Sequence, residues 1–264
     1  MGKRVFVFPG QGSQYIGMGK EFYDTMPVAK EVFDLASKVT GLDIPKLCFE
    51  ENDQLNITEY TQIAMLAVEA AMLKAVEEKG IKADVTAGLS LGEYGALLTA
   101  GVMDEADVFR LVRKRGIYMQ EEYPQGGAMS AILGLDTDTI EKICEETEGQ
   151  VSVANYNCPG QTVITGEENA VAKAAEKLAE AGAKRCVSLK VSGPFHTSLM
   201  KPAGDLLAKR FEGVSFNEPK NKVIFNATGK TMQEGETFEA LLEKQVQSSV
   251  YLEDSIALMK EQGV

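Results

Sequence analysis

Residues 86–97 read TAGLSLGEYGAL and place one serine, Ser90, between two glycines, Gly88 and Gly92. The apolar run at residues 83–88 predicts a buried strand, and residues 91–100 have the spacing of a helix. A strand, a tight turn and a helix with serine at the turn are typical of a nucleophile elbow, where a side chain at either glycine would crowd the strand and the helix. The stretch therefore predicts an α/β fold with a nucleophilic serine, and a chance match of G-x-S-x-G is the alternative.

Composition places the chain among ordinary globular proteins. It has 264 residues, 44% hydrophobic and 25% charged, and a net charge of −12 that argues against binding to nucleic acid. Four cysteines without a C-x-x-C pair and a single histidine argue against a zinc site. No metal and no cofactor are expected. The N-terminal apolar run is too short for a signal peptide, and no stretch reaches the about 20 apolar residues of a membrane span. We therefore expect a reduced, cytoplasmic protein.

Strand and helix patterns alternate on both sides of the elbow. A short buried strand is predicted at residues 5–8. Helices are predicted over residues 59–79 and 105–121, and Asp104 is in place to cap the second. This alternation predicts a parallel sheet covered by helices.

Residues 125–192 follow a different pattern. They predict a strand, a helix, two strands around Asn-Cys-Pro-Gly, a helix and a strand, which is the β-α-β-β-α-β order of a ferredoxin-like unit. A helix over residues 198–211 and a strand over 222–226 then continue the larger sheet. We expect an α/β subdomain built from residues 1–124 and 193–264, with the ferredoxin-like subdomain inserted into it.

A serine hydroxyl needs a base, and His196 is the only histidine of the chain. It lies in SGPFHTSLM, at a loop end just before a predicted helix. A helix N-terminus lowers the pKa of an imidazole and helps to keep it neutral. A surface histidine or a neighbour of a helix cap is the alternative. No acidic residue stands out as a third triad member, and a backbone carbonyl can orient the ring instead.

Arg115 interrupts the apolar side of the helix predicted over residues 105–121. Val108, Leu111 and Met119 share its side of that helix. A buried guanidinium needs a partner, and no companion acid is evident on the helix. The partner can be the carboxylate of a ligand, held by a two-pronged pair of hydrogen bonds. A structural salt bridge to a distant Asp or Glu is the alternative.

The loop after the first strand reads FPGQGSQYIGMGK, residues 8–20. It is glycine-rich but fits neither a dinucleotide fingerprint nor a P-loop, because Tyr15 and Gln14 stand where those motifs need glycine. Such a loop can instead offer a backbone N–H to an oxyanion. A plain turn is the alternative.

Taken together, these stretches resemble the malonyl-CoA:acyl carrier protein transacylases of bacterial fatty-acid synthesis, relatives of the acyltransferase domains of polyketide synthases. The resemblance runs from the first strand to the end of the chain and rests on the ordered motifs FPGQGSQ, TQ-x-A, G-x-SLGEY, R-x-x-x-M, AN-x-N-x-P-x-Q and PFH. It implies an α/β-hydrolase-like large subdomain with a ferredoxin-like insert. It also implies transfer of a malonyl group from malonyl-CoA to the phosphopantetheine thiol of acyl carrier protein through a malonyl-serine.

The resemblance carries over to seven residues of this sequence. It implies Ser90 as nucleophile, His196 as base, Gln11 and Leu91 as donors of the oxyanion N–H groups, Arg115 as the ligand of the malonyl carboxylate, Phe195 as the ring that leaves little space for an α-methyl group, and Gln245 as the residue that orients the histidine through its main-chain carbonyl.

Three positions depart from the family pattern. Leu89 stands where most members have a histidine. Because that histidine does not act as a base in the family, activity is expected to survive. Ser249 occupies a usual proline position. Family members continue beyond the position of Val264 with a Gly-Pro-Gly segment and more helix, and loss of packing there is expected to weaken the fold near Gln245.

The expected partners are acyl carrier protein and a coenzyme A thioester, with no nucleic acid and no membrane, and the expected state is a monomer. For an acidic carrier, candidate positive surface comes from Lys184, Arg185, Lys190 and Lys201. Three alternatives stay open. They are a serine thioesterase or esterase, a non-catalytic module that binds acyl carriers, and a free-standing acyltransferase of a polyketide assembly line.

Overall fold

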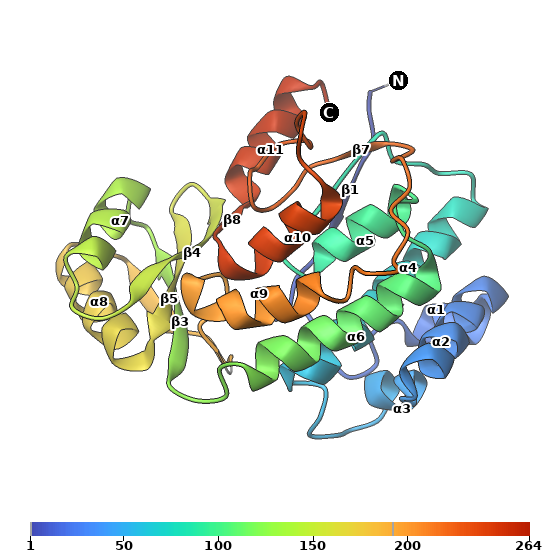
Figure 1. The fold of residues 1–264 in the computed structure, drawn as a ribbon, viewed down its shortest axis with the longest axis horizontal. Helices are drawn as coiled ribbons and strands as arrows, with labels where there is room; N and C mark the ends of the chain where they lie inside the picture. Colours follow the sequence, from blue (N-terminus) through green and yellow to red (C-terminus); the bar gives the residue numbers. More distant parts are fainter. Residues whose placement is uncertain (1, 192) are drawn as a thin grey trace.

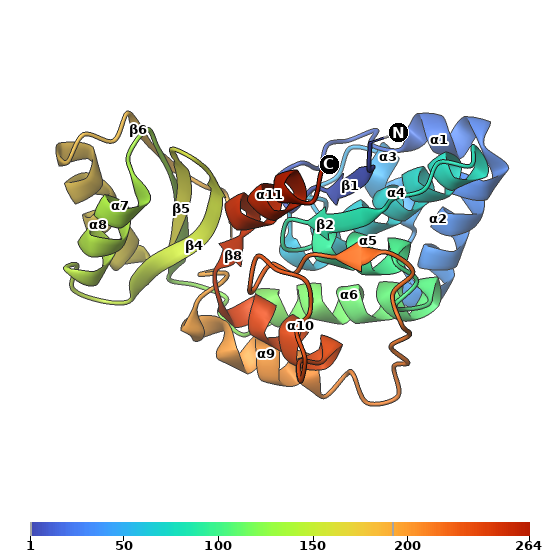
Figure 2. The same cartoon turned by 90° about the horizontal axis from the view of Figure 1, so that it is seen from above.

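A three-stranded parallel sheet lies in the larger part of the molecule (Figures 1 and 2). The computed structural model describes residues 2–191 and 193–264. The strands stand in the order β1 (Val5–Phe8), β2 (Val85–Gly88) and β7 (Lys222–Val223). All four residues of β2 are buried, as expected of a strand with a neighbour on each side and helices on each face. This strand is the apolar run that leads into the serine turn.

Helices pack on both faces of this sheet and in layers beyond them. They are α1 (Lys20–Thr25), α2 (Pro27–Thr40), α3 (Ile44–Phe49), α4 (Thr58–Glu78), α5 (Gly92–Thr99), α6 (Glu105–Glu121), the 3₁₀ turn η1 (Ser198–Met200), α9 (Lys201–Ala208), α10 (Phe238–Gln247) and α11 (Leu252–Glu261). The hydroxyl of Thr86 in β2 donates to the main-chain oxygen of Ala96 in α5 at 3.2 Å. Met259 of α11 packs with Val85 on the opposite face. Among the described residues, no helix combines the length and apolar character needed to cross a bilayer.

A second sheet builds the smaller part, seen at the left of Figure 1. Its elements follow the chain as β3 (Gly127–Leu133), α7 (Thr137–Glu145), β4 (Val151–Cys158), β5 (Gln161–Glu167), α8 (Glu168–Glu180) and β6 (Arg185–Ser188). The four strands stand in the order β6-β3-β5-β4, and Ile140 and Leu178 of the two helices share a buried cluster with the strands. The predicted fold class, an α/β sheet part with a ferredoxin-like part, is confirmed.

The smaller sheet gains a fifth strand from the C-terminal region. β8 (Val250–Tyr251) pairs in parallel with β4, and the rings of Tyr156 and Tyr251 stack with centroids 5.0 Å apart. Ser249, at the position where the family has proline, donates its hydroxyl to the main-chain oxygen of Val153 at 2.7 Å. Residues 125–192 therefore do not build this sheet alone. The predicted subdomain boundaries stay a prediction, and Ser192, at the second of them, lies outside the described residues.

Two helix predictions differ from the structure in detail. Asp104 occupies the position before α6, but its side chain accepts no capping hydrogen bond. The helix predicted over residues 198–211 is divided into η1 and α9 and ends at Ala208. Pro202 lies in the first turn of α9, where its missing N–H is tolerated because that turn has no helical partner for it.

The strand predicted over residues 222–226 ends at Val223. Ile224 still donates its N–H to Thr86 at 3.0 Å, but the N–H of Phe225 turns to the oxygen of Lys230 at 2.8 Å. Asn226 therefore leaves the strand ladder, and both its backbone N–H and its side chain point to the elbow instead.

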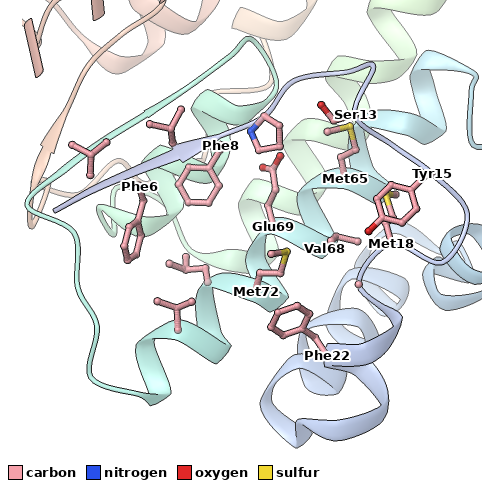
Figure 3. A pocket seen from close by; sticks show the side chains of 16 residues that line it. Phe6, Phe8, Ser13, Tyr15, Met18, Phe22, Met65, Val68, Glu69 and Met72 are labelled. Atoms are coloured by element: carbon pink, nitrogen blue, oxygen red, sulfur yellow. The ribbon is translucent and has the colours of Figure 1, made fainter. Parts of the chain in front are cut away.

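An apolar groove of about 580 Å³ runs beside β1, an edge strand of the parallel sheet (Figure 3). Glu69 extends from α4 into this groove between Phe8 and Met65 (Figure 3). The residue is 6% exposed, and neither carboxylate oxygen has a hydrogen-bond partner among residues 2–191 and 193–264. Burial raises the pKa of Glu69 well above its ordinary value. His196 does not line this groove, so the serine–histidine chemistry lies elsewhere.

Candidate active site

Ser90 stands at the turn between β2 and α5 with a φ of 54°. This left-handed conformation is uncommon for a residue that carries a side chain. A Cβ added to Gly88 would lie 1.9 Å from the carbonyl carbon of Gly92, and one added to Gly92 would lie 2.2 Å from the main-chain oxygen of Phe8. Both glycines are therefore required by close backbone contact, as the G-x-S-x-G spacing predicted.

The glycine-rich first loop passes directly against this turn. A Cβ on Gly10 would lie 2.6 Å from the main-chain oxygen of Leu89, so the loop needs glycine to approach the residue before the nucleophile. Gln11 follows and anchors its side chain by donating to Thr58 Oγ1 at 3.1 Å. Gln11 and Leu91 both line the cavity that contains Ser90. The two residues predicted to supply oxyanion donors thus flank the nucleophile.

His196 brings its ring to the serine from a distant part of the chain. Its Nε2 lies 2.8 Å from Ser90 Oγ, and its Nδ1 lies 2.9 Å from the main-chain oxygen of Gln245. A carbonyl oxygen can accept but not donate, so Nδ1 carries the proton and Nε2 accepts from the serine hydroxyl. Burial, and next the positive charge of Arg115, lower the pKa of His196 to about 4. The ring is therefore neutral near pH 7 and is able to take a proton.

Gln245 contacts the other three groups at once. Besides its main-chain contact to His196, its Nε2 donates to the main-chain oxygen of Ser90 at 2.8 Å. Its Oε1 accepts from Arg115 Nη2 at 2.9 Å. The residue is fully buried in α10. It therefore ties the elbow, the base and the guanidinium into one network.

Arg115 is a buried cation held by neutral groups. It is 1% exposed, and its Nη1 donates to Gln62 Oε1 at 2.6 Å. Its Nη2 donates to Ser90 Oγ at 3.1 Å, and the guanidinium lies 5.4 Å from the ring centre of Tyr94. Within the described ranges no carboxylate lies at salt-bridge distance from it, and Nε has no hydrogen-bond partner. A structural salt bridge, the alternative to a ligand carboxylate, is therefore absent from the described part of the chain.

A cavity of about 160 Å³ opens above the serine. Of the predicted site residues, five line it: Gln11, Ser90, Leu91, Phe195 and His196. Its remaining walls come from both parts of the molecule, including β3 to β5 of the smaller sheet. The structure thus gathers all seven predicted residues, since Arg115 and Gln245 bond to Ser90 directly.

Sequence reasoning assigned no role to several polar residues that the structure places here. Gln62 bonds Arg115, and Asn155 and Asn157 of β4 line the cavity. All three lie in motifs quoted only for the resemblance, TQ-x-A and AN-x-N-x-P-x-Q, and Gln62 is also a polar position in the apolar stretch QIAMLA. Glu93 lies in a third motif quoted only for the resemblance, G-x-SLGEY, whereas Asn226 lies in none of the quoted motifs, although both contact the elbow region.

The four basic residues considered for carrier docking are all exposed. Lys201 bonds Asp205 at 2.5 Å, so its charge is partly offset. Lys184, Arg185 and Lys190 lie at β6 or within a few residues of it. The positive surface near the smaller sheet therefore depends mainly on these three.

Comparison with known proteins agrees with this geometry. The acyl transferase domain family matches residues 5–263. The malonyl CoA-acyl carrier protein transacylase of Bacillus subtilis (strain 168) is 43% identical over 100% of this chain and 85% of its own length. The protein of the same name from Escherichia coli (strain K12) is 44% identical over 98% of this chain and 86% of its own length.

Solved structures show the same fold. The malonyl CoA-acyl carrier protein transacylase of Clostridium perfringens superposes with a TM-score of 0.95 at 41% identity, covering 99% of this chain and 84% of that one. A malonyl-transacylase solved in complex with a type II polyketide synthase acyl-carrier protein has a TM-score of 0.95 at 43% identity, covering 98% of this chain and 86% of that one. The chain therefore belongs to the acyl transferase domain family and, within it, to the malonyl CoA-acyl carrier protein transacylases.

Proposed function

We propose that the chain transfers a malonyl group from malonyl-CoA to the phosphopantetheine thiol of an acyl carrier protein, through a malonyl ester on Ser90. One observation carries the proposal most directly. The Ser90 hydroxyl lies 2.8 Å from the neutral base His196 and 3.1 Å from Arg115, a cation with no carboxylate partner among the described residues. The proposed nucleophile, its proposed base and a cation able to bind a carboxylate therefore meet at one oxygen atom.

In the first half-reaction Ser90 Oγ attacks the thioester carbon of malonyl-CoA while its proton passes to His196 Nε2. The tetrahedral intermediate collapses by breaking the carbon–sulfur bond. The proton on His196 then goes to the departing sulfur, so coenzyme A leaves as a thiol. Malonyl-Ser90 and a neutral imidazole remain.

In the second half-reaction the carrier thiol takes the place of coenzyme A. His196 accepts its proton as the sulfur attacks the ester, and returns that proton to Ser90 Oγ when the ester bond breaks. The carbonyl of Gln245 keeps Nδ1 protonated throughout, so that Nε2 is the nitrogen that exchanges the proton in both halves. The cycle ends with the free serine.

We assign the oxyanion donors to the backbone N–H groups of Gln11 and Leu91. Leu91 directly precedes the first turn of α5, where the helix dipole favours negative charge, and Gln11, in the first loop, lines the same cavity. Loss of one such donor typically slows catalysis by about 10²–10³-fold.

Arg115 supplies the preference for a malonyl group. Its neutral partners leave a full positive charge in a buried site, and the carboxylate of malonyl-CoA would pair with that charge. An acetyl group would leave the charge unpaired, which disfavours its transfer. Phe195 lines the cavity above Ser90 and is proposed to restrict space for an α-methyl group.

We propose the exposed residues Lys184, Arg185 and Lys190 as part of the carrier docking surface, with Lys201 as a lesser contributor because it is bonded to Asp205. Charge reversal at the first three should slow transfer to the carrier at low salt and leave formation of malonyl-Ser90 unchanged. We also propose a monomer in a reducing compartment, the cytoplasm, where the four unpaired cysteines would persist. Light scattering on the purified chain tests the monomer.

A transfer assay tests the function as a whole. The chain is mixed with malonyl-CoA and a phosphopantetheinylated acyl carrier protein, and both malonyl-carrier and free coenzyme A are measured. We expect them to appear in equal amounts, with little free malonate, and neither to form with Ser90→Ala. Release of free malonate at a similar rate without the carrier would instead identify a thioesterase.

A further inference from the structure

We propose that Asn226 and Glu93 are positioning residues, which together hold the Ser90 elbow in the conformation that presents its hydroxyl to His196. The inference rests on the proposed function, because it concerns the same nucleophile. Neither side chain is among the groups that line the cavity, so both would act through the backbone of the elbow and not through contact with substrate.

The Asn226 side chain bonds to the backbone on both sides of the turn. Its Oδ1 accepts the N–H of Ser90 at 2.6 Å, and its Nδ2 donates to the main-chain oxygen of Gly88 at 2.6 Å. An N–H must donate and a carbonyl must accept, so these two partners leave one orientation for the amide. Asn226 is fully buried, so water does not compete for either bond. The residues before and after Leu89 are thereby held at a fixed separation.

Glu93 fixes Asn226 in turn. Its Oε2 accepts the backbone N–H of Asn226 at 2.5 Å, and the residue is fully buried. Glu93 lies in the first turn of α5, three residues after the nucleophile. The hydrogen bonds from Ser90 to Asn226 and from Asn226 to Glu93 therefore close a ring with the chain itself, so the start of the helix and the turn support each other.

The ring acts on a strained residue. Ser90 has a φ of 54°, and such conformations persist where the surroundings enforce them. Both backbone groups of Ser90 are bound by side chains, since Gln245 donates to its main-chain oxygen at 2.8 Å while Asn226 accepts from its N–H. Removing the Asn226 bonds frees one end of the turn. Serine would then relax toward ordinary dihedral angles, and Oγ would move from His196 Nε2.

The Glu93 carboxyl keeps its role in either protonation state. Burial raises the pKa of Glu93 to about 8. The N–H of Asn226, the charge of Arg115 and the side chain of Gln245 each lower this pKa, but their combined effect is smaller than that of burial. A protonated carboxyl still has a carbonyl oxygen that can accept from Asn226. Glutamine offers the same acceptor, so Glu93→Gln is a conservative variant and Glu93→Ala a disruptive one.

Single-turnover kinetics with malonyl-CoA test the inference. Ile224→Ala is the matched control, because Ile224 is fully buried, lies two residues before Asn226 and packs in a cluster with Val85, Ala87 and Met259. We expect Asn226→Ala and Glu93→Ala to slow formation of malonyl-Ser90 by about 10²-fold, with the half-saturating malonyl-CoA concentration changed by less than about threefold. Glu93→Gln and Ile224→Ala should stay within about threefold of the parent rate when all are measured well below their unfolding midpoints.

Rates for Asn226→Ala and Glu93→Ala that match that of Ile224→Ala would overturn the inference, because both residues would then contribute to stability alone. Should Asn226→Ala not fold, Asn226→Asp replaces it; this variant keeps an acceptor for Ser90 but no donor for Gly88. A parent-like rate for Asn226→Asp, together with a parent-like rate for Glu93→Ala, would also overturn the inference.

The rate at which a fluorophosphonate labels Ser90 measures the reactivity of the same hydroxyl without malonyl-CoA. If the parent chain forms no malonyl-serine, the proposed function fails; if it does and the variants match it, the positioning role alone fails.

Discussion

His196 Nδ1 lies 2.9 Å from the main-chain oxygen of Gln245, so a peptide carbonyl orients the base at the place where a Ser-His-Asp triad has a carboxylate. A carbonyl fixes the tautomer but carries no negative charge to stabilise an imidazolium. Burial and, next, the positive charge of Arg115 have the opposite effect and lower the pKa of His196. His196 is thus a weak base, and its imidazole is neutral in the free enzyme near pH 7.

This relationship predicts the pH dependence of the enzyme. With a pKa lowered to about 4, His196 should be neutral across the neutral range, and the acid limb of kcat/KM should lie near pH 4 and not near the ordinary value of 6.5. Arg115→Ala removes one of the two causes of the lowering, so the limb should move to higher pH. Arg115→Lys retains the charge and should leave it in place. If the acid limb of kcat/KM lies at the same pH in Arg115→Ala as in the parent chain, burial alone sets the pKa of His196.

The stability contribution of His196 has a definite sign. Its pKa in the folded state is lower than in the unfolded state, so the unfolded chain binds the extra proton first as the pH falls. The contribution is therefore fully present above the unfolded value and is lost as the pH falls from 6.5 toward about 4. His196→Gln should reduce the loss of thermal stability over this interval, as measured by unfolding midpoints at a series of pH values.

Arg115 should govern the choice between malonyl and acetyl groups. Arg115→Ala should lower malonyl transfer by about 10²-fold or more and bring malonyl and acetyl rates to within about tenfold of each other, because the unpaired buried charge that rejects acetyl is gone. Competition between malonyl-CoA and acetyl-CoA, read by mass spectrometry, measures the preference. An unchanged preference would remove Arg115 from the role assigned to it.

A substitution at Gln245 tests whether the positive charge of Arg115 binds the malonyl carboxylate. Its Oε1 lies 2.9 Å from Arg115 Nη2, so Gln245→Glu would place a carboxylate on the guanidinium with little change of shape. This internal ion pair should compete with the substrate and raise KM for malonyl-CoA by about tenfold or more, with a smaller effect on acetyl-CoA. The main-chain contact to His196 is kept, but the side-chain donor to the main-chain oxygen of Ser90 is lost. Equal effects on the two substrates would show disturbance of the elbow and not competition for Arg115.

Glu69 should destabilise the chain at neutral pH. It is buried beside β1 without a hydrogen-bond partner in the described part of the chain, and its pKa is raised by that burial. The folded state favours the protonated form, so the stability associated with Glu69 is present below the ordinary pKa of 4.5 and falls as the pH rises. Glu69→Gln should therefore raise the unfolding midpoint at about pH 8 more than at about pH 5. A gain independent of pH would contradict this account.

Much of the site could be predicted because its chemistry depends on local patterns. The glycines around Ser90 are required by contacts within one strand–turn–helix unit, and a single histidine leaves one choice of base. The helix predicted over residues 105–121 has those bounds in the structure, with Arg115 buried on its apolar side.

The residues that sequence reasoning missed are those whose role depends on tertiary contact. Asn226 reaches Ser90 across 136 residues of sequence because the chain leaves the sheet after Val223, and no periodic pattern marks that exit. Glu93 lies in the quoted motif G-x-SLGEY, but its contact with Asn226, 133 residues further along the chain, is not visible in the sequence. Likewise β8 is two residues long, and its pairing with β4 cannot be inferred from so short a segment.

The central claim is that Ser90, activated by His196, carries the malonyl group. Peptide mapping by mass spectrometry after brief exposure to malonyl-CoA, without carrier, tests it most directly. We predict one malonyl group on the peptide that contains Ser90, absent in Ser90→Ala, formed far more slowly in His196→Ala, and lost on addition of acyl carrier protein. A malonyl group on any other residue, or an unmodified Ser90 peptide while malonyl-carrier accumulates, would contradict the account.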